Sequence, residues 1–172
     1  MKDTIKIEFR EIKIGKHIFV SDPCYPKNNG GNIQLNAKNG IYKTFAEKCK
    51  MPFWGERVAS ISIVHIDYID NIDSLRKEYI GDICVDSGTA GIYDGNYFEK
   101  YHFSDTIDDD WYDKYICTKL DNIAIFDGKS IVSSAGIGDG VYGVYGVYDE
   151  NNQIVALTIQ YIDNDHFDDE DD

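Results

Sequence analysis

The chain has 172 residues, a length suited to one domain, and 42% of them are hydrophobic, enough for a sizeable core. It carries 17 Lys and Arg against 31 Asp and Glu, a formal net charge of −14. Such a charge repels the phosphate backbone of nucleic acids and anionic membranes, so direct binding to either is not expected. Acidic residues crowd the C-terminus. We therefore predict a single β-rich domain over 1–162 and a disordered acidic tail over 163–172.

The four cysteines stand far apart, without a C-x-x-C pair or a nearby histidine pair. This spacing argues against a zinc site and against a disulfide scaffold, and it predicts free thiols in a reducing compartment. The first residues alternate between charged and apolar and do not resemble a signal peptide. No apolar run approaches the roughly 18 residues of a membrane-spanning helix. We expect a cytoplasmic protein that needs no metal or other cofactor.

Short strands separated by turns are predicted along the first half of the chain. Ile5, Ile7 and Phe9 alternate with polar residues, which is typical of a strand with one buried face. Asn39-Gly40 is a strong turn signal. On β-branched content and flanking turns, further strands are predicted over 17–20, 41–46, 57–67 and 80–86.

The second half predicts two helices among further strands. One helix is expected over Asp94–Tyr101, opening on an N-cap residue, and one over Asp108–Leu120, where three acids favour the helix dipole. The remaining strands are expected over 122–126, 130–134, 141–148 and 154–162. This order indicates an α+β fold that is mainly β, an antiparallel sandwich or barrel-like sheet with two short helices.

The first candidate motif is S-D-P-C-Y over Ser21–Tyr25. In a catalytic interpretation Cys24 is a nucleophile, Asp22 positions it, and His65 is the base. In a structural interpretation Asp22 accepts hydrogen bonds from backbone amides and Cys24 packs as a small apolar residue. His65 itself lies within a predicted strand, where a buried, hydrogen-bonded histidine is the alternative to a functional one.

The second motif is V-D-S-G-T-A-G-I-Y-D, which contains Asp86, Ser87, Gly88 and Asp94. Carboxylates and a hydroxyl after a buried strand can accept hydrogen bonds from a ligand, and glycine lets backbone amides approach that ligand closely. The alternative is a tight turn in which Asp86 satisfies the loop's own amides.

The third motif, S-S-A-G-I-G-D-G-V-Y, contains Gly136, Gly138, Asp139, Gly140 and Tyr142. Three glycines at alternate positions can expose backbone amides suited to an anion. A strand follows instead of a helix, and the lysine of a phosphate loop is missing, so neither nucleotide-binding fingerprint applies. The alternative is an ordinary hairpin loop.

Together these motifs resemble a group of uncharacterised proteins from Gram-positive bacteria and their phages. The later two also resemble a larger bacterial domain-of-unknown-function family with D-x-G-x-x-x-x-x-D and G-x-G-D-G-x-Y stretches, here over Asp86–Asp94 and Gly136–Tyr142. The resemblance covers most of the chain from Gly15 to Asp163. It implies a phage or prophage setting and supplies no catalytic residues.

The functional prediction is a non-enzymatic binding protein of phage or prophage type. It would antagonise host defence by holding a defence protein or by sequestering a small signalling nucleotide. The predicted ligand site combines the second and third motifs with Asp22 and His65. Two alternatives stay open: a small hydrolase or transferase using Cys24, His65 and Asp139, and an immunity-like module that binds a protein through its acidic surface.

Overall fold

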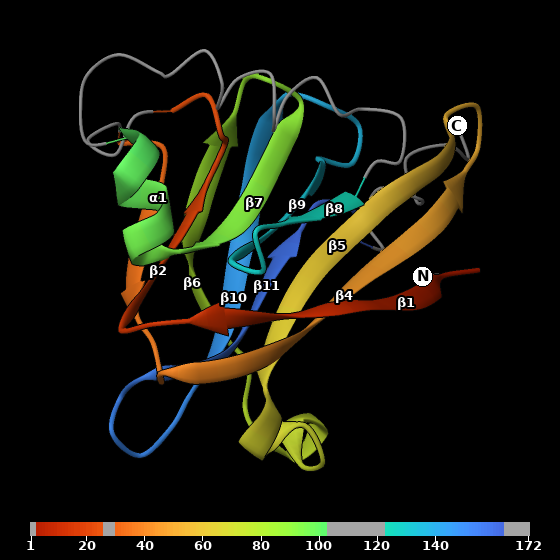
Figure 1. Cartoon of the computed structure of the whole chain (residues 1–172). Coiled ribbons are helices and arrows are strands. Elements are labelled where there is room, and N and C mark those ends of the chain that lie inside the picture. Colours follow the sequence, from red (N-terminus) through yellow and green to blue (C-terminus); the bar gives the residue numbers. More distant parts are fainter. Residues whose placement is uncertain (1–2, 26–29, 103–122, 164–172) are drawn as a thin grey trace.

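The computed structural model describes residues 3–25, 30–102 and 123–163 (Figure 1). Within these ranges the chain forms two antiparallel sheets. The six-stranded sheet has the order β1 (Ile5–Ile14), β4 (Gly40–Met51), β5 (Gly55–His65), β11 (Ile154–Gln160), β10 (Gly140–Tyr148) and β6 (Glu78–Val85). The five-stranded sheet has the order β3 (Ile33–Asn36), β2 (His17–Ser21), β7 (Thr89–Asp94), β9 (Ser130–Ser134) and β8 (Ile123–Phe126).

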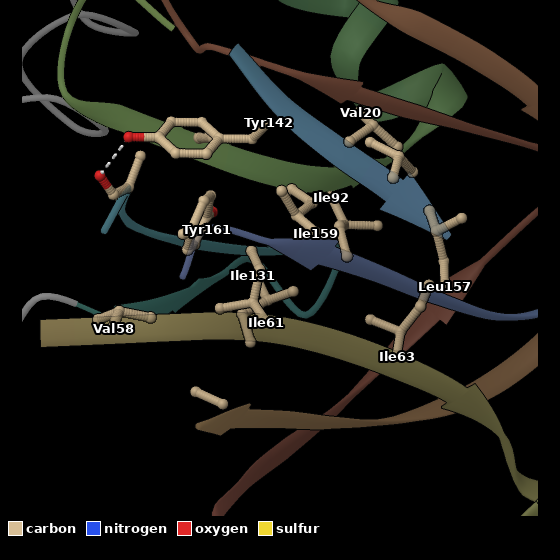
Figure 2. Close-up of a cluster of buried hydrophobic side chains, with 14 of the residues drawn as sticks. Val20, Val58, Ile61, Ile63, Ile92, Ile131, Tyr142, Leu157, Ile159 and Tyr161 are labelled. Atoms are coloured by element: carbon tan, nitrogen blue, oxygen red, sulfur yellow. Dashed lines mark hydrogen bonds between the residues drawn. The ribbon is translucent and has the colours of Figure 1, made fainter. Parts of the chain in front are cut away.

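The main core lies between the two sheets (Figure 2). Ile61 and Ile159 from the larger sheet and Ile92 and Ile131 from the smaller one are fully buried there. Each is part of a strand whose side chains alternate between the two faces of its sheet. The mainly β antiparallel fold is confirmed. The sheets keep separate edges, so the arrangement is a sandwich and not a closed barrel.

The helical content differs from the prediction. The first predicted helix is present as α1 (Gly95–His102), and it covers the outer face of the smaller sheet. The second, over 108–120, and most of the acidic tail lie outside the described residues. Two short 3₁₀ turns, η1 (Ile66–Tyr68) and η2 (Ile72–Ser74), follow β5. The described part of the chain therefore has one α-helix and two 3₁₀ turns where two helices were expected.

Strand β7 was not predicted, because its sequence, T-A-G-I-Y-D, shows no alternation. All six of its residues are buried. It lies in the middle of the smaller sheet, with the main core on one face and α1 on the other. A strand covered on both faces loses the polar–apolar alternation by which strands are recognised.

The two ends of the sandwich differ. At the end that we call the loop end, the β6–β7 turn (86–88) lies beside the start of β10, because Val85 pairs with Gly140. The hairpin between β4 and β5 also turns at this end, seen at the upper right in Figure 1. The opposite end holds the β10–β11 hairpin and the end of β5. No helix of the described residues is long and apolar enough to cross a membrane.

Candidate ligand-binding site

Asp22 connects the end of β2 to the β6–β7 turn at the loop end. Its buried carboxylate accepts four hydrogen bonds. Oδ1 accepts from the Cys24 amide at 2.7 Å and from the Ser87 hydroxyl at 2.8 Å. Oδ2 accepts from the amides of Asp86 and Ser87, both at 2.8 Å. Both oxygens are thus occupied by the protein's own donors, an arrangement that matches the structural interpretation of the first motif.

The side chains that follow Asp22 are held in their protonated forms. Burial, together with the neighbouring Asp22 and Asp86 charges, raises the pKa of the Cys24 thiol to about 11. Burial, and then the hydrogen bond with Asp86, raises the pKa of Tyr25 well above its ordinary value. A thiol with so high a pKa is protonated at neutral pH, whereas the nucleophile of cysteine catalysis is the thiolate.

The β9–β10 loop closes on itself around Gly136. The Gly138 amide donates to the Ala135 carbonyl at 2.7 Å, and Gly136, the first residue between them, has a φ of +47°. Positive φ at this position is typical of a type II′ turn, in which glycine is preferred. A Cβ on Gly136 would lie 2.8 Å from Cβ of Tyr161. Both the positive φ and this close contact therefore disfavour any residue larger than glycine at position 136.

The side chain of Tyr142 holds the same loop from the core side. Its hydroxyl donates toward the carbonyl oxygens of Gly138 at 2.6 Å and Ala135 at 3.2 Å. Figure 2 shows the Tyr142 ring among the buried side chains of the core. Burial, with a smaller contribution from Asp139, raises the pKa of this hydroxyl, which therefore stays a donor. Tyr142 thus supports the loop from the core instead of facing a ligand.

The β6–β7 turn and the β9–β10 loop lie against each other. The Ala135 amide donates to the Gly88 carbonyl at 2.9 Å. A Cβ placed on Gly88 would lie 3.8 Å from Oδ1 of Asp139. The exposed carboxylates of Asp86 and Asp139 therefore stand on neighbouring loops at the same end of the molecule. The second and third motifs, about 50 residues apart in the chain, are brought together by the β6–β10 pairing.

Between these loops and the start of β5 lies an open pocket of about 220 Å³. Its lining consists of Arg57, Val58, Gly88 and Ser134–Gly138. Within the described residues the Arg57 guanidinium donates to the Glu56 carbonyl at 3.2 Å and has no carboxylate within ion-pair distance. The amides of Gly136 and Ile137 likewise have no acceptor in this part of the chain. The residues that line the pocket therefore include a guanidinium without a carboxylate partner and two amides without an acceptor in the described part of the chain, and such groups bind anions in proteins.

Sequence reasoning did not find Arg57. It stands at the beginning of a predicted strand, and nothing in its neighbourhood marks it as different from a solvent-exposed charge. Its position follows from the strand register. Ser60 pairs with Gln160, Gln160 pairs with Gly143, and Arg57 comes three residues before Ser60. That alignment places the start of β5 beside the glycine loop.

Asp94 does not join this pocket. It ends β7, and its buried carboxylate accepts from the Tyr97 amide at 3.0 Å and from the Gly15 amide at 2.7 Å. The first contact is that of an N-cap residue with the third residue of a helix, here α1, as predicted for this position. The second ties the β1–β2 connection to the helix start.

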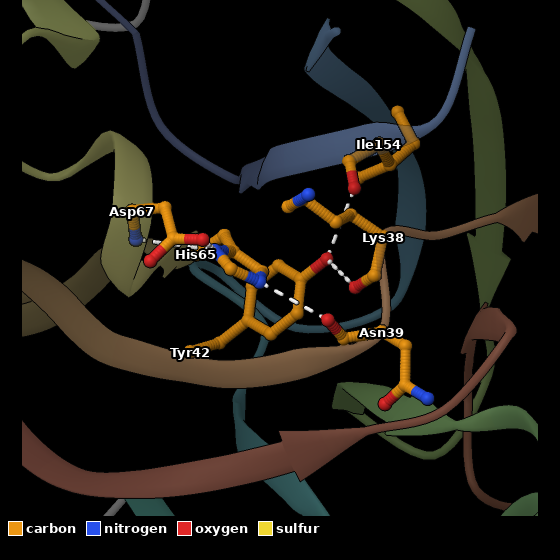
Figure 3. A network of polar contacts seen from close by, with 6 residues as sticks. All are labelled: Lys38, Asn39, Tyr42, His65, Asp67 and Ile154. Carbon is orange, nitrogen blue, oxygen red and sulfur yellow. Dashed lines mark hydrogen bonds and ion pairs between the residues drawn. The ribbon is translucent and has the colours of Figure 1, made fainter. Parts of the chain in front are cut away.

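His65 lies at the opposite end of the larger sheet (Figure 3). Its ring is buried, Nδ1 accepts from the Asp67 amide at 3.1 Å, and Nε2 lies 3.1 Å from the Asn39 carbonyl. These partners assign the neutral tautomer with the proton on Nε2. The ring packs edge-on against Tyr42, whose hydroxyl lies within hydrogen-bond distance of two carbonyl oxygens, those of Lys38 at 2.6 Å and Ile154 at 3.0 Å. His65 is thus far from both Cys24 and Asp139.

The predicted site residues fall into two groups. The structure brings together the residues of the loop end, while His65 and Asp94 lie elsewhere. The loop-end residues are Asp22, Asp86, Ser87, Gly88, Gly136, Gly138, Asp139, Gly140 and Tyr142. Within the described ranges no three His, Cys, Asp or Glu side chains gather in a way that could hold a metal ion.

The fold and the pocket define a two-sheet β-sandwich with a small polar pocket between its end loops. A family model described as "Protein of unknown function (DUF4241)" matches residues 15–159, and the chain belongs to that family. Comparisons with curated proteins and with solved structures find no significant match. The assignment agrees with the resemblance to a family of unknown function seen in the sequence.

Proposed function

We propose that this protein is a non-enzymatic binding protein that holds a small, phosphate-bearing, nucleotide-like ligand in the loop-end pocket. The observation that carries the proposal is the guanidinium of Arg57, which lines the pocket without a carboxylate partner among the described residues. In a chain of net charge −14, a cation is readily neutralised by a neighbouring acid. A guanidinium that stays unpaired beside free amides suits an incoming phosphate.

The geometry favours a nucleotide over inorganic phosphate. A volume of about 220 Å³ is below the usual range of roughly 300–1,000 Å³ for ligand sites, so the pocket encloses one end of a ligand and leaves the rest at its mouth. The exposed carboxylates of Asp86 and Asp139 can accept hydrogen bonds from sugar hydroxyls or base amino groups there. The exposed side chain of Ile137 offers apolar contact to a base.

Binding without catalysis is favoured because the alternative catalytic set does not meet. Cys24 has a raised pKa of about 11, and the candidate base His65 is at the other end of the sheet. The wider role that we propose is that of a cytoplasmic phage or prophage protein that antagonises host defence by sequestering a signalling nucleotide. This role rests on the family resemblance and on the shape of the pocket.

Isothermal titration calorimetry with nucleoside monophosphates, cyclic mononucleotides, cyclic dinucleotides and inorganic phosphate tests the proposal. At least one nucleotide should bind saturably and more tightly than phosphate. Arg57→Gln should weaken that binding at least tenfold, whereas Arg76→Gln, the same change at an exposed arginine in the 75–77 segment before β6, should not. Equal affinity of the two variants, or the absence of binding across the panel, would sink the proposal.

A second candidate function, binding of a host protein, is favoured by the tip of the β4–β5 hairpin. Phe53 is 98% exposed and Trp54 is 51% exposed. Aromatic residues that project from a rigid element are typical anchors of protein interfaces. If this tip binds a host protein, Phe53→Ser with Trp54→Ser should abolish its capture without lowering the melting temperature. Capture that persists in the double variant would exclude the tip as the anchor.

A further inference from the structure

A second cavity, independent of the loop-end pocket, lies on the outer face of the larger sheet. It has a volume of about 330 Å³. Its floor follows one register row across four strands: Phe45 on β4 pairs with Ser62 on β5, Ser62 with Thr158 on β11, and Thr158 with Tyr145 on β10. We call this cavity the outer groove. It exists because two small residues separate two large aromatic ones on the same face of the sheet.

One side of the outer groove is apolar. Val64, Val147 and Ala156 lie beside the polar row, and the segment that contains η2 packs over them with Ile72 and Leu75. The three sheet residues are 5–8% exposed. A ligand in the groove therefore meets a continuous apolar wall on this side, and covering that wall favours binding.

The row beside this wall has polar groups with an unused hydrogen-bond donor. The hydroxyls of Ser62 and Thr158 are 2.9 Å apart and hydrogen-bond to each other. Only one hydroxyl hydrogen is used in that bond, so the other remains available to an acceptor. Thr158 is nearly buried, and a ligand oxygen above this pair would satisfy the remaining donor.

A lysine stands at each end of the row. The Lys6 ammonium lies 4.5 Å from the centre of the Phe45 ring, and the Lys77 ammonium lies 5.8 Å from that of Tyr145. Among the described residues neither ammonium has a carboxylate within ion-pair distance. Both ammonium groups are thus held over aromatic rings at the groove, without a direct ion pair to a described carboxylate.

The remaining charges on the groove limit the charge of the ligand. Glu47 and Asp73 also line it, so the lining carries two charges of each sign. A polyanion such as a nucleoside diphosphate would meet these carboxylates. A single negative charge can be bound by the lysines without adding net repulsion.

We propose that the outer groove binds a small amphipathic monocarboxylate, with its carboxylate between Lys6 and Lys77 and its apolar body against Val147, Ala156 and Leu75. The apolar wall matches the body of such a molecule. The spare hydroxyl donor and the two ammonium groups, neither in a direct ion pair with a described carboxylate, match its carboxylate. The inference stands apart from the proposed function, because the groove shares no residue with the loop-end pocket.

Calorimetric titration with decanoate, decanol and decylammonium tests the charge selectivity. Decanoate should bind saturably, and at least tenfold more tightly than the other two. Lys77→Gln should weaken decanoate binding several-fold, and Lys6→Gln with Lys77→Gln should remove the preference for decanoate over decanol. Lys50→Gln, the same change at an exposed lysine near the hairpin tip, should leave decanoate binding unchanged. Equal effects of Lys50→Gln and Lys77→Gln, or equal binding of the three probes, would overturn the proposal.

A blocking variant tests the location. Ala156→Leu adds bulk inside the groove, and in a protein with unchanged circular dichroism it should abolish decanoate binding. If that variant misfolds, Leu75→Ala, which shortens the apolar wall from the covering segment, should weaken decanoate binding instead. Arg57→Gln should have no effect. Full decanoate affinity in a folded Ala156→Leu or Leu75→Ala protein would place any binding elsewhere and refute the site.

Discussion

Replacing Asp22 by asparagine changes one atom of a buried group that accepts four hydrogen bonds. The variant keeps one carbonyl oxygen and gains an NH₂ group, which cannot accept. If the oxygen serves the amides of Asp86 and Ser87, the NH₂ group faces the Cys24 amide and the Ser87 hydroxyl. The hydroxyl can rotate to accept, whereas the Cys24 amide loses its partner.

The cost has two parts. One buried N–H left without an acceptor costs about 1–3 kcal/mol. The remaining hydrogen bonds lose their charge assistance, which roughly halves their strength. We therefore expect Asp22→Asn to lower the free energy of unfolding by about 2–4 kcal/mol, a large share of the roughly 5–15 kcal/mol of a typical domain.

Urea denaturation followed by tryptophan fluorescence and by circular dichroism measures this loss. The matched control is Asp86→Asn, the same change at the exposed neighbour, which should alter the free energy of unfolding by less than about 0.5 kcal/mol. The m-value should be unchanged in both variants. If Asp22→Asn is as stable as Asp86→Asn, the carboxylate does not hold the two loops together. Its assignment as a structural residue would then be refuted, and its role as a ligand group would regain support.

Three further outcomes are expected. Gly136→Ala should lose about 2 kcal/mol or more of stability in chemical denaturation, since it adds backbone strain to a close contact with Tyr161, whereas Gly30→Ala, with open space around it, should be nearly neutral. Phe53→Asn should raise the melting temperature, because Phe53 is exposed at a φ of +62° that asparagine tolerates better; a lower melting temperature would show that the aromatic ring stabilises the hairpin. Cys24, with a pKa of about 11, should be alkylated by iodoacetamide slowly at pH 8 and progressively faster up to about pH 11, and a rate already at its plateau at pH 8 would contradict that pKa.

The sequence predicts those features of the site that depend on neighbouring residues in the chain. The strand ending at Val85, the turn after it and the Asp94 cap follow from neighbours in the chain, and the sequence predicts all three, with the strand end within one residue. Which carboxylates face a ligand is a different matter. Asp22 and Asp86 are equally plausible ligand groups in the sequence, and only the fold shows that Asp22 is consumed by the amides of the β6–β7 turn.

The sequence by itself determined the class of fold, because period-two alternation and turn residues act between near neighbours. It also pointed to the glycine-rich loops, where we propose a site. The tertiary structure decided the rest. Sheet register placed Arg57 beside the glycine loop and separated His65 from Cys24. The residues in these contacts are tens of positions apart in the chain. The sequence around each residue does not show which distant strand it will pair with, so these contacts cannot be predicted from local patterns.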